Sequence, residues 1–256
     1  MCGRRKLEKE YPELVNWGDI DFGLLKKISK QVPKNIIIQF FNNGEGLLYP
    51  RFGEAVRLFD KQIKCLNTNG KLLLEKADEI IDNLDTLTIS VIENDPEGNQ
   101  QYEGVKKFLE IKGKRNPRLI YRLLGDVGII NGPDGRVSHD EEAKKRWYKL
   151  PGLIATRIIH SPMGSFNYTK KVTVPEHGIC LDLLNHMAID RFGNVSLCVR
   201  FDPEKKLVIG DAAKEKLFNI WNSKKRQDII KLHIEGRRCE IPGCDKCEFY
   251  GCPTGS

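Results

Sequence analysis

Short apolar runs alternate with amphipathic stretches between residues 20 and 160. The five apolar runs are rich in β-branched residues, are bounded by Gly, Asn, Asp or Pro, and cover residues 35–41, 63–67, 86–92, 118–124 and 153–159. Leu, Val, Ile and Phe recur at helical spacing in residues 20–30, 51–61, 71–83 and 102–112, and a further helix is predicted over residues 140–149. This order predicts a parallel sheet with crossover helices. A doubly wound sheet and a barrel fit the order equally well.

The pattern changes near residue 170. Short strand-like pieces follow, then one helix over residues 217–232 and a cysteine-dense tail. We therefore expect a main domain over residues 1–170 and a small α+β domain over residues 171–256, with the boundary at 165–178.

The composition is that of a globular chain. Of its 256 residues 30% are charged, and no apolar run approaches the ~20 residues that cross a bilayer. The first ten residues are charged and contain no apolar secretory signal, which predicts a reducing, cytoplasmic setting. The net charge is +7, and basic residues cluster at 144–146 and 224–226. The simplest interpretation of these clusters is a solvated surface. An acidic electron donor or an anionic substrate is the alternative, and no clear nucleic-acid site is visible.

Cysteine is unevenly distributed, because six of the eight cysteines lie from Cys180 onward. In a reducing compartment this clustering favours metal ligation over disulfides. Cys180 and Cys198 bracket a predicted hairpin with a glycine turn at Gly193, and Cys244 and Cys247 form a C-x-x-C pair. Four thiolates of this kind bind Zn²⁺ or an iron–sulfur cluster, and the spacing does not distinguish them.

Three further cysteines have simpler interpretations. Cys239 and Cys252 flank the C-x-x-C pair and are best interpreted as structural thiols, with spare ligands or a partial second site as the alternatives. Cys65 is predicted to be a buried residue of a strand.

The segment from Cys180 to Cys198 resembles the opening of the SPASM and twitch domains of radical S-adenosylmethionine (radical SAM) enzymes. The stretch after Cys198, with Gly210 and the helix that follows it, resembles the segment between the cysteines of those domains. A SPASM domain usually has seven cysteines for two clusters, whereas this tail has six. The resemblance therefore implies a twitch-like domain with one auxiliary [4Fe–4S] cluster, held by Cys180, Cys198, Cys244 and Cys247.

The same resemblance implies that residues 1–170 are a radical SAM core, a partial (β/α) TIM-like barrel that binds S-adenosylmethionine (SAM). Residues 41–50 follow a strand where the family has a Gly-Gly-Glu-Pro motif. Gly44 and Glu45 correspond to the second glycine and the glutamate of this motif, which bind the methionine amino group of SAM. Asn43 and Gly46 replace the first glycine and the proline of the motif. Without the resemblance to the family, an acidic residue between two glycines after a strand usually belongs to a turn.

Two later strands contain residues that match further SAM contacts of the family. Ser90 corresponds to a hydroxyl for the SAM ribose, and Arg122 to a base that meets the cofactor carboxylate. A strand hydroxyl with a local partner and an ion pair with a protein acid are the alternatives.

The beginning of the sequence departs from the family pattern. Radical SAM cores hold their [4Fe–4S] cluster with C-x-x-x-C-x-x-C after the first strand. Cys2 resembles the third cysteine of this motif, which implies that the first strand and two ligands lie upstream. We expect a fragment or a misassigned start codon.

The resemblance implies one-electron cleavage of SAM to a 5′-deoxyadenosyl radical, which takes a hydrogen atom from an unknown peptide, sugar or nucleotide. A reductant such as flavodoxin or ferredoxin is implied as partner, and the auxiliary cluster would transfer electrons or bind substrate. No individual catalytic residue can be assigned. Two alternatives stay open: a zinc-ribbon binding module, and a cluster-bearing protein without SAM chemistry because two core ligands are absent.

Overall fold

The computed structural model describes residues 7–9, 11–41, 44–92, 100–124, 145–156, 179–199, 202, 204–245 and 247. Packing divides the chain into two compact units. The sheet unit consists of the described residues of Pro33–Ile159, and the cysteine unit consists of those of Met1–Val32 and His160–Thr254. The predicted boundary at 165–178 lies outside the described residues.

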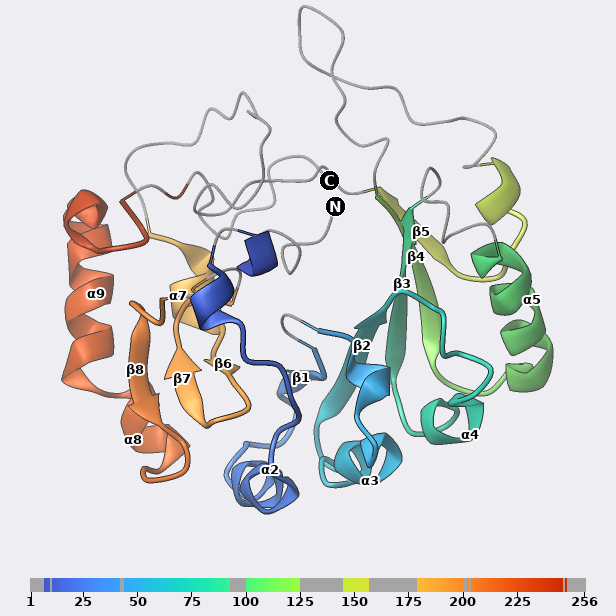
Figure 1. Cartoon of the computed structure of the whole chain (residues 1–256), viewed down its shortest axis with the longest axis horizontal. Helices are drawn as coiled ribbons and strands as arrows, with labels where there is room; N and C mark the ends of the chain where they lie inside the picture. The colour runs from blue at the N-terminus through green and yellow to red at the C-terminus, as the bar shows by residue number, and fades with distance from the viewer. Residues whose placement is uncertain are drawn as a thin grey trace, which may run out of the picture. The chain divides into compact units, whose positions relative to one another are not determined.

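The sheet unit contains a five-stranded parallel sheet whose strands lie side by side in chain order. The strands are β1 (Ile37–Gln39), β2 (Ile63–Thr68), β3 (Thr86–Ile92), β4 (Arg118–Leu124) and β5 (Leu153–Thr156). Helices α3 (Phe52–Arg57), α4 (Ala77–Ile80) and α5 (Gln101–Lys112) lie along one face (Figure 1). The predicted α/β class with a parallel sheet is confirmed. Helices α3 and α4 are shorter than predicted, because residues 58–61 after α3 are not helical and residues 71–76 before α4 form turns.

The two faces of this sheet differ in chemistry. One face packs its buried Leu66, Leu87, Ile89 and Tyr121 against the helices. Because successive side chains of a strand point to opposite faces, the residues between them share the other face. That second face holds Asn67, Thr88, Ser90 and Arg122 in matching register, with Ala155 beside Arg122. It is therefore the more polar face of the sheet.

The cysteine unit contains a three-stranded antiparallel sheet of β6 (Ala188–Ile189), β7 (Asn194–Ser196) and β8 (Val208–Asp211). The predicted hairpin is confirmed at β6–β7, where Gly193 takes a φ of 93° that favours glycine. The hairpin is shorter than predicted, because α7 (Leu181–Asn185) follows Cys180 directly. Short 3₁₀ turns occur at η1 (Pro12–Leu14) and η5 (Arg238–Glu240) in this unit, and at η2 (Gly46–Leu48) in the sheet unit.

Helix α2 (Phe22–Ser29) packs in the cysteine unit, although its place in the sequence suggested a crossover helix of the sheet. Ile28 is buried with Val195, Leu197 and Ile220 in the core of this unit. Gln31, just after the helix, accepts a hydrogen bond from the backbone N–H of Leu217 at 2.9 Å. The predicted helix exists, and its apolar face is buried against the C-terminal part of the chain.

The helix predicted over 217–232 is two helices, α8 (Leu217–Trp221) and α9 (Lys224–Ile234). Ser223 separates them in an extended conformation, and its hydroxyl accepts a hydrogen bond from the N–H of Arg226 at 3.3 Å. The apolar periodicity runs through this junction, whereas the serine cap starts a new helix. None of the helices within the described residues has the length and apolar character to cross a membrane.

Replacing Ser223 with Ala is expected to destabilise the protein by about 1 kcal/mol, because the first turn of α9 loses its cap. Chemical denaturation of both variants measures this loss, and Ser223→Asp serves as the control because an aspartate also caps. Equal losses in Ser223→Ala and Ser223→Asp would show that the cap does not stabilise α9.

Candidate functional sites

Glu45 links two loops at the carboxyl edge of the parallel sheet. One carboxylate oxygen accepts a hydrogen bond from the N–H of Leu47 at 3.3 Å, in the turn after β1. The other oxygen accepts from the N–H of Asn69 at 3.0 Å, directly after β2. The predicted acid therefore lies at the ends of two neighbouring strands and fixes the loops that follow them.

The glycines around Glu45 have different surroundings. A Cβ on Gly44 would meet none of the described atoms within 4 Å, so no described neighbour requires a glycine there. A Cβ on Gly46 would lie 2.3 Å from the carbonyl oxygen of Phe40, which excludes any larger residue. Gly44 is thus open to the approach of a ligand, whereas Gly46 is required by the packing of the loop.

Gln101 extends this network to β3. At the start of α5, its amide nitrogen donates to the carbonyl oxygens of Asn69 at 2.6 Å and Ser90 at 2.9 Å. It holds the carboxyl ends of β2 and β3 together. Sequence reasoning missed Gln101, because a side chain that binds backbone carbonyls leaves no residue pattern.

Ser90 and Arg122 are register partners on neighbouring strands, near the carboxyl ends of β3 and β4. Both point to the polar face of the sheet. The structure therefore brings Gly44, Glu45, Ser90 and Arg122 to one edge of one sheet, as expected for residues at the ends of parallel strands.

The described cysteines predicted as ligands gather in the cysteine unit. Cys180 precedes α7, Cys198 follows β7, and Cys244 and Cys247 follow η5. Cys180, Cys198 and Cys244 pack within or against the same apolar core. Cys2 lies outside the described residues.

The thiol groups of these four cysteines influence one another electrostatically. Burial, followed by the charges of Cys247, Cys198 and Cys180, raises the pKa of Cys244 to about 12, although Arg238 acts to lower it. Burial also raises the pKa of Cys180, which the backbone N–H groups of Asp182 and Leu183 lower. The four sulfurs are close enough to repel one another as thiolates, and a bound metal centre would remove this penalty.

Within the described residues, no three His, Cys, Asp or Glu side chains form a set that could hold a single metal ion. The cysteines of a [4Fe–4S] cluster bind different iron atoms, so they need not converge on one point. The remaining described cysteines lie elsewhere: Cys239 is exposed, and Cys65 is a half-buried residue of β2 in the sheet unit. The prediction of a buried Cys65 is therefore met only in part.

Arg226 holds the helix that follows Cys180. Its buried guanidinium donates to the carbonyl oxygens of Leu183 at 2.9 Å and Leu184 at 3.3 Å, and it lies 3.6 Å from the ring centre of Trp221. These contacts join α7 to α8 and α9. The prediction that the basic residues 224–226 form a solvated surface is wrong for Arg226, because its side chain is buried.

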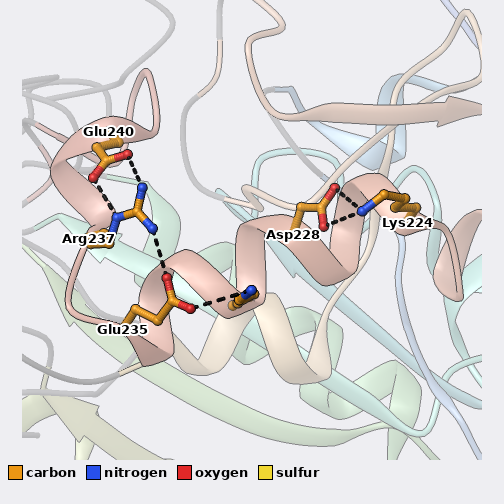
Figure 2. Close-up of polar contacts among 6 residues, drawn as sticks. Lys224, Asp228, Glu235, Arg237 and Glu240 are labelled. Atoms are coloured by element: carbon orange, nitrogen blue, oxygen red, sulfur yellow. Dashed lines mark hydrogen bonds and ion pairs between the residues drawn. The ribbon is translucent and has the colours of Figure 1, made fainter.

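Figure 2 shows the charged pairs along α9 and the turn that leads to the C-x-x-C pair. Arg237 binds both carboxylate oxygens of Glu240, at 2.7 and 2.8 Å, and Glu235 at 2.9 Å. Lys224 forms a separate, exposed pair with Asp228 at 2.9 Å. The Arg237 pairs fix the chain just before Arg238, which donates to the carbonyl oxygen of Cys247 at 2.7 Å.

Residues 180–248 match the family model of SPASM, an iron-sulfur cluster-binding domain. These residues form a SPASM domain. Its matched range begins at Cys180 and includes Cys198, Cys244 and Cys247, so the domain and the cysteine cluster coincide. The match decides between the zinc and iron–sulfur interpretations of the SPASM domain in favour of a cluster.

Solved structures are similar to this chain in fold over most of its length. BtrN in complex with AdoMet and 2-DOIA is similar with a TM-score of 0.55 at 17% identity, over 94% of this chain and 85% of that one. Native anSMEcpe with bound AdoMet is similar with a TM-score of 0.53 at 15% identity, over 91% and 81%. No curated protein matches the chain in sequence. With the SPASM domain, these likenesses confirm the predicted resemblance to radical SAM proteins of this type.

Replacing Arg226 with Met is expected to destabilise the SPASM domain by roughly 2–3 kcal/mol, because buried carbonyl groups of α7 lose a charged donor. Lys224→Met is the matched control, since Lys224 is exposed and its loss should hardly change the free energy of unfolding. Denaturant titration measures both. Equal stability of the two variants would contradict the proposed anchoring of α7.

Proposed function

We propose that the protein is a radical SAM enzyme whose SPASM domain holds one auxiliary [4Fe–4S] cluster through Cys180, Cys198, Cys244 and Cys247. The observation that carries this proposal is that the residues matched as a cluster-binding domain include all four cysteines, three of which pack in or against one apolar core. Four thiolates satisfy the four irons of one cluster, so a single cluster fits the described cysteines.

For SAM we propose the carboxyl edge of the parallel sheet. Gly44 and Glu45 would bind the methionine amino group, Ser90 the ribose and Arg122 the carboxylate. Both oxygens of Glu45 already accept a backbone N–H, but an ionised carboxylate offers about four acceptor positions, so an ammonium group still fits. The open position beside Gly44 supports a close approach of the ligand.

We also propose that the sheet is part of a β/α barrel whose interior is the polar face with Thr88, Ser90 and Arg122. Supporting this, helices cover the opposite, apolar face, as in a barrel. Ligands of such folds bind at the carboxyl ends of the strands, where the four predicted SAM residues lie.

When bound, SAM and a reduced [4Fe–4S] core cluster supply a 5′-deoxyadenosyl radical that takes a hydrogen atom from the substrate. The chain itself would orient SAM through Glu45, Ser90 and Arg122. Gln101 joins the loop after β2, which Glu45 also binds, to the carbonyl group of Ser90 in β3. Cys2 stays a predicted ligand of the core cluster. A flavodoxin or ferredoxin as reductant, and a peptide, sugar or nucleotide as substrate, stay predictions as well.

Anaerobic reconstitution of the chain should yield about four irons and four sulfides attributable to the SPASM domain. Cys244→Ala should lose them and the broad absorption near ~400 nm, and the domain should lose stability because cluster binding contributes to folding. Cys239→Ala and Cys2→Ala are the matched controls and should retain this cluster.

Iron, sulfide and zinc analysis per chain decides the outcome. One zinc without iron would overturn the cluster proposal and favour a zinc-ribbon module. Loss of iron in Cys239→Ala but not in Cys244→Ala would show that the ligand set is wrong.

Replacing Arg122 with Met is expected to weaken SAM binding about tenfold or more, because a charged hydrogen bond to the carboxylate is lost. Arg118→Met is the matched control: Arg118 lies on the same face of β4 but at its amino end. Calorimetric titration of the reconstituted protein with SAM measures both. Equal affinities of the two variants, or no SAM binding by the unmodified protein, would contradict this placement of SAM.

A further inference from the structure

Arg238 is directed at the C-x-x-C pair of the SPASM domain. It begins η5 and lies half-buried, and its guanidinium donates a hydrogen bond of 2.7 Å to the carbonyl oxygen of Cys247. The side chain thus bridges from the turn before the cysteine pair to its last residue. A cation is held next to two of the four proposed ligands.

The hydrogen bond to Cys247 places the charge of Arg238 beside a buried part of the domain. Cys244, the other cysteine of the pair, is only 9% exposed, so water screens a nearby charge less there than it would at the surface.

The neighbouring Arg237 provides a contrast within the same turn. Its guanidinium makes a two-bond contact with Glu240 and a third bond with Glu235, and all three side chains are exposed (Figure 2). Its charge is therefore compensated by two acids in solvent. Two adjacent arginines have different tasks: Arg237 fixes the turn, and Arg238 contacts the cysteine pair.

We propose that Arg238 is a positioning residue that raises the reduction potential of the auxiliary cluster. The proposal rests on the proposed function, because it requires a cluster at Cys180, Cys198, Cys244 and Cys247. Reduction adds one negative charge to a cluster that four thiolates already make negative, and a nearby cation favours that reduced state. The bond to Cys247 keeps the cation at a fixed place beside the cluster.

This role suits a cluster that accepts electrons. Among the factors that set the potential of an iron–sulfur cluster, net charge and exposure to solvent are prominent. A buried site would by itself disfavour the more highly charged reduced state, and Arg238 offsets this effect. The structure thereby assigns to Arg238 the adjustment of the potential.

The experiment compares the reconstituted wild-type chain with Arg238→Gln, Arg238→Met, Arg238→Lys and Arg237→Gln. Iron and sulfide per chain are determined first, and a redox titration followed by electron paramagnetic resonance then gives each potential. Removal of the charge in Arg238→Gln and Arg238→Met should favour the oxidised cluster about tenfold, a fall of ~59 mV for one electron. Arg238→Lys should retain most of the wild-type potential, and Arg237→Gln all of it.

An unchanged potential in Arg238→Gln or Arg238→Met, with iron content intact, would overturn the proposal. An equal fall in Arg238→Lys would overturn it too, because the charge would then have no role. If either Arg238→Gln or Arg238→Met does not take up iron, the potential of the other variant decides whether the proposal holds. Failure of the proposed function is recognised separately, since the wild-type chain would then contain no cluster.

Discussion

The packing of three cysteines in or against one small core is the constraint on which the SPASM domain depends. Cys180, Cys198 and Cys244 belong to or pack against the same apolar cluster as Ile28, Val195 and Ile220. As thiolates they would repel one another in a medium that disfavours charge, and the raised pKa of Cys244 expresses this cost. A bound cluster converts the cost into stabilisation, because cluster binding and folding of such a segment are coupled.

Side chains that bind backbone carbonyls organise both units. In the sheet unit, Gln101 joins the ends of β2 and β3. In the cysteine unit, Arg226 holds the carbonyl groups of α7 and Arg238 holds that of Cys247. Loops that carry functional residues have few regular hydrogen bonds of their own, so donors from neighbouring helices and turns restrict their movement.

The elements that sequence predicted well are those with a strong local signal. The five strands of the sheet coincide with the predicted apolar runs, although β1 covers only Ile37–Gln39 of the run over 35–41, and Gly193 marks the hairpin turn. The spacing of Cys180, Cys198, Cys244 and Cys247 predicted a shared site; this set stays a prediction, and three of its members pack in or against one apolar core. Within the sheet, the parallel order placed Glu45, Ser90 and Arg122 at one edge, because carboxyl ends of parallel strands share an edge.

The features that sequence did not predict depend on packing over long distances. The periodicity of α2 indicated an apolar face but not which unit buries it. Apolar periodicity also continued through Ser223, whose side chain caps the start of a new helix. The roles of Gln101, Arg226 and Arg238 were not predicted, because carbonyl oxygens are present at every residue and these partners therefore have no signature in sequence.

The position of α2 has a consequence for the order in which this protein acquires structure during synthesis. The core of the cysteine unit unites a helix that the ribosome makes before the parallel sheet with strands and cysteines that it makes after the sheet. The parallel sheet, whose residues are contiguous in the chain, can complete its contacts before α2 meets its partners. Helix α2 therefore exposes an apolar face until those strands and cysteines are synthesised, and the cluster can be inserted only after Cys247 has been made.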